Sequence, residues 1–181
     1  MKGNQANVTI DGTDVSVQFK FDKRFMSHKF KSNAVKYEVA VCIQSGNIVW
    51  INGPFRGAES DITIARQSLI DALDEDEMVE GDGGYDGEEF RIKIPADATS
   101  EEEKIMKQNA RSRHETCNKR FKIFGILKKQ FRHGLDKHSS CFRAVAVITQ
   151  LCIEHGAQLY SVDYCDEIST NHKDADFELI T

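Results

Sequence analysis

The chain has 181 residues, of which 40% are hydrophobic and 29% charged, and its formal net charge is -5. These values are typical of one soluble globular domain. No apolar run approaches the roughly 18 residues that a membrane span needs, and the first residues contain no apolar signal core. The five cysteines form no C-x-x-C pair, which is typical of reduced thiols. We therefore expect a nuclear or cytoplasmic protein that is not secreted.

Charge is distributed unevenly along the sequence. Residues 71–103 contain fourteen acids and two basic residues, whereas residues 104–137 contain eleven basic residues and two acids. The net charge alone disfavours a nucleic-acid partner, but a phosphate backbone responds to the local face of a protein. The basic segment is either an ordinary solvated helix surface or a nucleic-acid contact. The acid embedded in it, Glu115, favours the second interpretation.

The first third of the chain is rich in strand patterns. A β-branched run predicts a strand over 8–10, and alternating apolar residues predict another over 15–21. Two further β-rich runs, 36–44 and 48–55, flank a short turn with a glycine and predict a hairpin. Pro54 is expected to stop its second strand.

The rest of the chain alternates helix and strand patterns. Ser60 or Asp61 can cap a first helix. Thr99 or Ser100, followed by three glutamates, predicts the start of a long helix that runs to about Gly125. The remaining elements are expected as short strands over 78–81 and 90–95, a last helix ending at Glu154, and an acidic, mobile tail over 165–181.

This order predicts an α/β fold, a mixed sheet with flanking helices, in one domain over residues 1–164. The strands near 8–11 and 78–82 should lie side by side, so that Asp11 and Asp82 meet at one edge, while Glu115 comes from the long helix. Three convergent carboxylates can hold two divalent ions about 4 Å apart, the usual device for attacking a phosphodiester. Such clustered acids repel, so at least one should have a raised pKa.

Each acid also has an ordinary interpretation. Asp11 and Asp82 both precede glycine and are typical of turns. On a helical wheel, Glu115 lies nearly opposite the apolar stripe of its helix, which predicts an exposed residue. Asp61 is expected to cap a helix and Asp14 to lie on a strand surface. It is the combination of the three acids that favours metal.

Several sequence segments together resemble the catalytic domain of PIF/Harbinger-type DDE transposases and the nucleases derived from them. The resemblance extends over about residues 7–164. Its segments are I-D-G-T-D at 10–14, S-H-K-F-K at 27–31, Y-E-V-A-V at 37–41, I-V-W-I-N-G-P-F at 48–55, S-D-I at 60–62, D-G-G-Y at 82–85, A-R-S-R-H-E-T-C-N at 110–118 and F-R-H at 131–133.

The resemblance implies a ribonuclease-H-like fold and a DDE triad of Asp11, Asp82 and Glu115. It also implies Mg²⁺ or Mn²⁺ as cofactor, and DNA strand cleavage and transfer as the reaction. Family members normally carry an N-terminal region with helical DNA-recognition elements, whereas this chain starts almost at the first catalytic strand. We therefore expect sequence recognition to come from a separate module or partner. Glu80 departs from the family pattern, and it either disturbs the metal site or faces solvent.

On the basic helix face around Glu115, we expect Arg111, Lys119 and Lys122 to contact DNA phosphates without selecting sequence. Lys36 is also expected to be exposed. Two other classes compete with the nuclease. A silent or domesticated DNA-binding or scaffold protein would keep the fold without activity, and a metal-dependent phosphatase would need only the acids.

Overall fold

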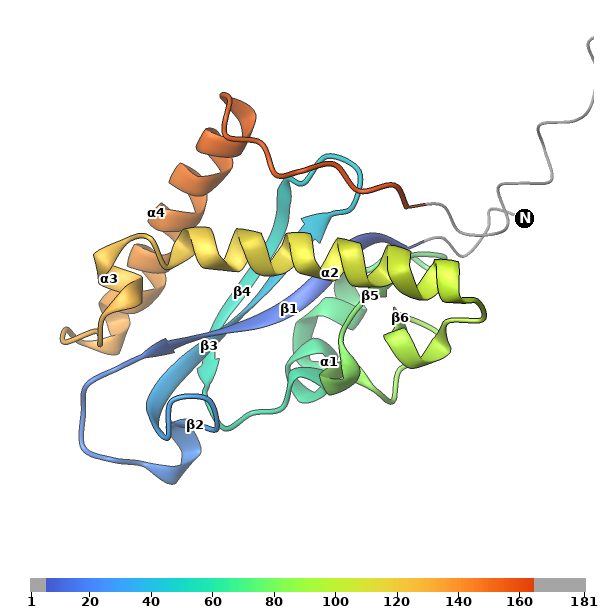
Figure 1. Cartoon of the computed structure of the whole chain (residues 1–181). Helices are drawn as coiled ribbons and strands as arrows, with labels where there is room; N and C mark the ends of the chain where they lie inside the picture. Colours follow the sequence, from blue (N-terminus) through green and yellow to red (C-terminus); the bar gives the residue numbers. More distant parts are fainter. Residues whose placement is uncertain (1–5, 165–181) are drawn as a thin grey trace, which may run out of the picture.

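A computed structural model describes residues 6–164 and shows a mixed sheet with helices on both faces (Figure 1). The predicted α/β fold class is confirmed, while the predicted tail at 165–181 lies outside the described residues. The strands are β1 (Ala6–Ser16), β2 (Met26–Ser27), β3 (Ser32–Cys42), β4 (Ile48–Arg56), β5 (Met78–Glu80) and β6 (Ile92–Lys93). The helices are α1 (Asp61–Ala72), α2 (Glu101–Phe121), α3 (Gly125–Lys128) and α4 (Leu135–Glu154).

The sheet has the strand order β2-β3-β1-β5-β6, with β4 also paired to β3. Strand β1 is antiparallel to β3 but parallel to β5, which in turn is parallel to β6. The predicted adjacency of the segments near 8–11 and 78–82 is therefore confirmed. Because β1 and β5 run in the same direction and their pairing ends at Thr9 and Glu80, the residues that follow β5 emerge beside the middle of β1, where Asp11 lies.

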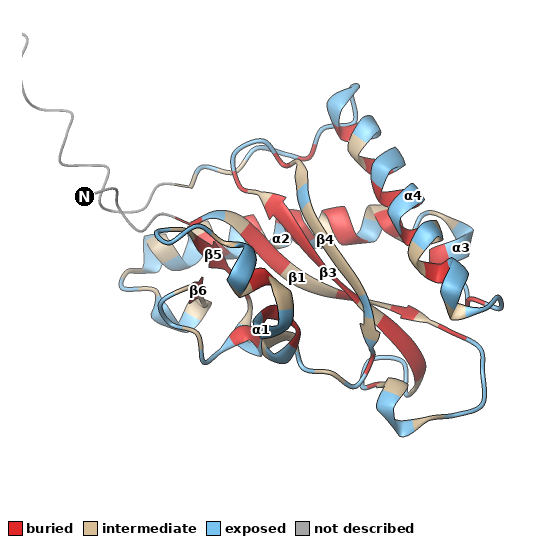
Figure 2. Cartoon of the chain, turned by 180° about the vertical axis from the view of Figure 1, so that it is seen from behind, coloured by how far each residue is buried: buried red, intermediate tan, exposed pale blue. Residues whose placement is uncertain are grey.

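Two hydrophobic clusters pack against the sheet, and buried residues occur along its strands and on the helices beside them (Figure 2). The larger joins β1 and β3 to α2, α3 and α4, and includes Phe142, whose ring stacks on Tyr37 with 3.8 Å between centroids. The smaller joins the sheet to α1. Burying one such aromatic or aliphatic side chain contributes about 1.5–3 kcal/mol, so the two clusters together fix the helices against the sheet.

Two strand predictions were wrong in detail. The two strands expected over 8–10 and 15–21 are one continuous strand, β1, that ends at Ser16, and residues beyond it leave the sheet. Pro54 does not stop its strand, because β4 continues to Arg56. Among the strands of residues 6–164, β4 pairs only with β3. Proline is tolerated on such an edge strand, where its missing N–H interrupts no second ladder.

The helix starts follow the sequence closely. Ser60 caps α1 and Ser100 caps α2, with the Ser100 Oγ accepting a hydrogen bond from Glu103 N at 3.1 Å. Helix α2 ends at Phe121, earlier than expected, and the chain turns at Phe124 into the short α3. In the described part of the chain, no helix has the length and apolar character to cross a membrane.

Candidate active site

Asp11 and Asp82 stand at matching positions relative to two parallel strands. Thr9 of β1 pairs with Glu80 of β5, and each acid follows its paired residue by two positions. Side chains alternate along a strand, so Asp11 shares the sheet face of Thr9. Asp82 lies just beyond the end of β5, where its Oδ1 accepts a hydrogen bond from Gly84 N at 2.7 Å. The local turn thus fixes the position of the second acid.

Helix α2 lies alongside β1 and brings the third acid to the same place. Thr9 Oγ1 is 2.7 Å from His114 Nδ1, and Asn118 Nδ2 donates a hydrogen bond to Asp11 Oδ2 at 2.9 Å. His114 and Asn118 are about one helical turn apart, and Thr9 and Asp11 are two strand residues apart. Helix α2 therefore runs alongside β1 in the same direction. Glu115 lies on the helix between His114 and Asn118, the two residues that contact β1.

One small cavity, about 60 Å³ in volume, is lined by all three predicted acids. The side chain of Glu115 is 60% exposed, as its place on the helical wheel predicted, yet it borders this cavity. An exposed Glu115 side chain can therefore still be part of the site formed with Asp11 and Asp82. The cavity lining consists of Thr9, Ile10, Asp11, Asp82, Arg111, His114 and Glu115.

The carboxyl group of Asp11 has a strongly shifted pKa. Its pKa is raised to about 6, first by burial and then by repulsion from Asp82 and Asp61, and the hydrogen bond from Asn118 offsets part of the rise. Burial and neighbouring negative charge both disfavour ionisation. A raised pKa among the clustered acids was expected from the sequence, and Asp11 has one, although burial contributes more to it than the neighbouring charges.

A family profile described as DDE superfamily endonuclease matches residues 10–151 of the chain, a segment that contains all three acids. The chain belongs to the DDE superfamily endonucleases. No curated protein and no solved structure matches it. The family suggests a metal-dependent nuclease or transposase, and its members generally use divalent metal ions.

The donor groups are of the type that a hard divalent cation prefers, although they are not arranged around one in the described part of the chain. Carboxylate oxygens are the ligands that Mg²⁺ prefers, and a cation would relieve the repulsion on Asp11. Within residues 6–164, no three Cys, His, Asp or Glu side chains form a ready metal site. Arg111 lies 3.8 Å from Asp82 and Lys119 lies 3.8 Å from Glu115, so two of the three acids each have a cationic side chain nearby.

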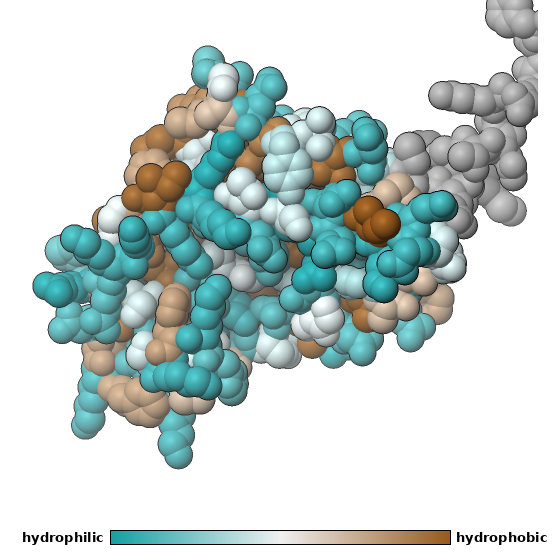
Figure 3. Space-filling view, viewed as in Figure 1, coloured by the Kyte–Doolittle hydropathy of each residue, from teal (hydrophilic) through white to brown (hydrophobic). Residues whose placement is uncertain are grey.

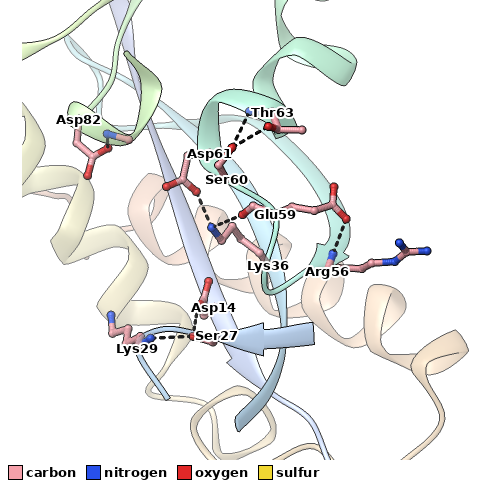
Figure 4. A network of polar contacts seen from close by, with 11 residues as sticks. Asp14, Ser27, Lys29, Lys36, Arg56, Glu59, Ser60, Asp61, Thr63 and Asp82 are labelled. Carbon is pink, nitrogen blue, oxygen red and sulfur yellow. Dashed lines mark hydrogen bonds and ion pairs between the residues drawn. The ribbon is translucent and has the colours of Figure 1, made fainter. Parts of the chain in front are cut away.

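Asp61 is a fourth acid at this site, and the sequence indicated only a helix cap (Figure 4). Its carboxylate lies between β1 and the turn that carries Asp82. A Cβ added at Gly12 would be 2.6 Å from Asp61 Oδ1, and one added at Gly84 would be 2.8 Å from Oδ2. Lys36 Nζ donates to Asp61 Oδ1 at 2.8 Å and its side chain is only 13% exposed. The prediction of an exposed Lys36 was wrong, because this lysine neutralises an acid beside the site.

His114 and Asn118 were also missed by the sequence analysis. His114 is fully buried, and burial lowers its pKa to about 3, so the imidazole is neutral. Among the described residues, its Nε2 and the Asn118 Oδ1 have no hydrogen-bond partner. Both residues lie within one turn of Glu115 on α2, and this spacing is the only sequence signal that could have pointed to them.

The expectation that Glu80 faces solvent was wrong. Its side chain is 1% exposed, so it does not face solvent, and it does not line the acid cavity. Lys107 Nζ lies 3.3 Å from Glu80 Oε1, and Tyr164 Oη donates to the same oxygen at 2.6 Å. Glu80 is therefore held in a buried ion pair between β5 and α2, where it joins the helix to the sheet.

The three predicted DNA-contact residues divide into two groups. Arg111 lines the acid cavity and pairs with Asp82, as described above. Lys119 and Lys122 instead line a larger cleft of about 610 Å³ that also reaches Asp11 and Glu115. The surface over α2 and α3 is largely hydrophilic (Figure 3). A negatively charged ligand bound to the lysines of this cleft would therefore lie next to Asp11 and Glu115.

We expect Asp11→Asn to stabilise the metal-free protein at neutral pH by up to about 3 kcal/mol. In the folded protein the pKa of Asp11 is raised from 3.8 to about 6. Between these values the native state binds a proton that the unfolded chain has released, so stability falls as pH rises through this interval and then levels off. Asparagine resembles the protonated acid and carries no such pH dependence.

Thermal unfolding in EDTA, from about pH 4 to about pH 8, measures this effect. The difference between Asp11→Asn and wild type should be largest above pH 6 and disappear near pH 4. Asp86→Asn is the matched control, since Asp86 is an exposed acid of the neighbouring turn. If the stability difference between Asp11→Asn and wild type is the same at every pH, the pKa of Asp11 is not raised in the folded protein.

Proposed function

We propose that this DDE superfamily endonuclease is a PIF/Harbinger-type, metal-dependent DNA nuclease or transposase domain with Asp11, Asp82 and Glu115 as its catalytic acids. The observation that carries the proposal is their arrangement around one small cavity, although they come from β1, the turn after β5, and α2. The cavity is contiguous with a lysine-lined cleft. That combination favours a polymeric phosphodiester over the small substrate of a phosphatase.

Each acid would serve the reaction through its own surroundings. Asp11 is held by the Asn118 amide, which fixes one carboxylate oxygen and leaves the other available. Asp82 is anchored through the Gly84 N–H, and Glu115, on α2, lines the same cavity as the other two acids. These three carboxylates would hold Mg²⁺ or Mn²⁺, which when bound supplies an activated water and neutralises charge at the phosphorus.

The neighbouring cations would help to place the substrate. When Arg111 and Lys119 leave Asp82 and Glu115, each is free to contact a phosphate close to the acids. Phosphate contacts position a nucleic acid but do not select its sequence. A freed 3′-hydroxyl in place of water would turn the same displacement into strand transfer. Target selection and nuclear action would then depend on a separate recognition module.

A second candidate is a catalytically silent DNA-binding or scaffold protein of the same fold. The observation in its favour is that, in the described part of the chain, no three potential ligands form a ready metal site, with Arg111 and Lys119 already paired to two of the acids. In this case Arg111 would act as a permanent substitute for the metal charge. The two candidates differ in whether Mn²⁺ displaces these contacts.

Mn²⁺ binding and plasmid nicking test the proposal together. Mn²⁺ at about 100 times its Kd should stabilise the wild type by about 2.7 kcal/mol through linkage, seen as a rise in melting temperature, and the purified chain should nick supercoiled plasmid. Asp11→Ala should lose the thermal shift and Asp82→Asn the nicking. No shift in the wild type, or an equal shift in Asp11→Ala, would reject the site. A shift without nicking would favour the silent protein.

A further inference from the structure

The larger cleft begins where the acid cavity ends, because Asp11 and Glu115 line both. Strand β1 contributes Thr13 and Ser16 to its lining. The turn after β2 lies on one side, and α2 and α3 lie on the other. Its basic and aromatic residues are Lys29, Phe30, Lys119, Lys122 and Lys128.

The cleft has more positive charge than its own acids neutralise. Within residues 6–164, Lys29, Lys122 and Lys128 form no ion pair, while Lys119 pairs with Glu115 at the end nearest the acids. The pKa of Lys122 is lowered, first by burial and then by repulsion from Lys29. The two ammonium groups are therefore close enough to repel, and a bound anion between them would relieve that repulsion.

The turn that carries Lys29 and Phe30 is held in place before any ligand binds (Figure 4). Ser27, which is fully buried, donates its hydroxyl hydrogen to Asp14 of β1. The same Ser27 oxygen accepts from Lys29 N at 3.2 Å and from Phe30 N at 3.3 Å. The Phe30 ring is left 38% exposed at the cleft. A fixed turn lowers the entropy cost of binding through both side chains.

We propose that this cleft binds an unpaired segment of a DNA strand next to the phosphate that the acids would attack. The lysines contact successive phosphates, and Phe30 stacks on one base. This assignment rests on the proposed function for the location of the scissile phosphate. An aromatic ring among lysines favours an unpaired strand, since stacking on a side chain requires a free base face, which a continuous duplex does not offer.

Fluorescence anisotropy with oligothymidylate of about ten nucleotides, in EDTA, tests the aromatic contact. Phe30→Ala should weaken binding of this probe roughly 5- to 150-fold, the loss expected for one stacked base, and leave binding of a blunt DNA duplex unchanged. Phe30→Leu, which keeps apolar area but loses the ring, should behave like Phe30→Ala. Equal loss for both probes, or no loss for either, would overturn the stacking of an unpaired base.

The salt dependence of the same probe tests the phosphate contacts. The double variant Lys29→Ala/Lys128→Ala should lower the slope of log K against log salt by about 1.4, because each contact to a single strand contributes about 0.7. The matched control is Lys20→Ala/Lys137→Ala, which removes two exposed lysines outside the cleft and should leave the slope unchanged. Equal slopes for wild type and the cleft variant would place the strand on another face.

These measurements involve no metal and no cleavage, so they separate the two proposals. If nicking fails but both binding results hold, the cleft binds a strand in a protein without nuclease activity. If nicking succeeds and the cleft variants bind oligothymidylate like the wild type, the acids are catalytic and the strand follows another path.

Discussion

Glu115→Gln is expected to lower the rate of Mn²⁺-dependent nicking at least about a thousandfold, or about 4 kcal/mol in the activation free energy. The substitution keeps the shape of the side chain but removes the charge that would complete a metal site with Asp11 and Asp82. Folding should be preserved, because the Glu115 side chain is 60% exposed. Initial nicking rates at saturating Mn²⁺, with melting temperature as the check on folding, measure the effect.

Controls on the same helix distinguish this role from that of a surface ion pair. If Glu115 only pairs with Lys119, its loss costs about 0.3–0.5 kcal/mol of stability and no activity. Glu102→Gln removes an exposed glutamate from the first turn of α2, away from the cavity, and should nick like the wild type. Nicking by Glu115→Gln within tenfold of the wild-type rate would remove Glu115 from the catalytic set.

The proximity of Asp11 and Asp82 could be predicted from the sequence, because the order and the apolar patterns of the strands indicate that the segments near 8–11 and 78–82 are neighbours in the sheet. Parallel pairing of β1 with β5 brings the two acids close together, as predicted, but only Asp82 follows its strand. The expectation that Asp11 stands at a strand end was wrong, because Asp11 lies inside β1, which continues to Ser16. The register that pairs Thr9 with Glu80 was not readable, since β5 has only three residues and offers no alternation to compare. That Asp11 and Asp82 each follow a paired residue by two positions is therefore known only from the structure.

The partners of the acids were harder to predict than the acids. Asp61 caps no helix end with its side chain, and only the crossing of α1 near β1 brings it to Lys36 and Gly12. On α2, polar residues such as His114 lie on the buried face, where a helical wheel expects apolar ones. Tertiary contacts decide such positions, because β1 supplies hydrogen bonds that make their burial tolerable.

Lys107→Met is expected to destabilise the protein by about 3–5 kcal/mol, the largest stability effect among the residues near the site. Lys107 and Glu80 are each 1% exposed, and their charges lie 3.3 Å apart. Removing the lysine leaves a buried carboxylate with only the hydroxyl of Tyr164 as a close partner on that oxygen. Denaturant unfolding at about pH 8 should show a lower midpoint with an unchanged m value.

The double variant Glu80→Met/Lys107→Met separates the cost of an orphaned charge from the loss of packing. Replacing both partners by apolar groups is often neutral or stabilising. The double variant should therefore recover the part of the loss due to Glu80, but not the part due to Glu103, whose Oε1 also lies 3.2 Å from Lys107 Nζ. Burial already raises the pKa of Glu80, and removing Lys107 raises it further. Without Lys107, Glu80 takes up a proton as pH falls, so the loss of stability in Lys107→Met should become smaller toward about pH 5.

Lys104→Met, which replaces an exposed lysine of the same helix, is the matched control. A double variant no more stable than Lys107→Met, with the same deficit at both pH values, would mean that packing rather than charge pairing holds α2 to β5.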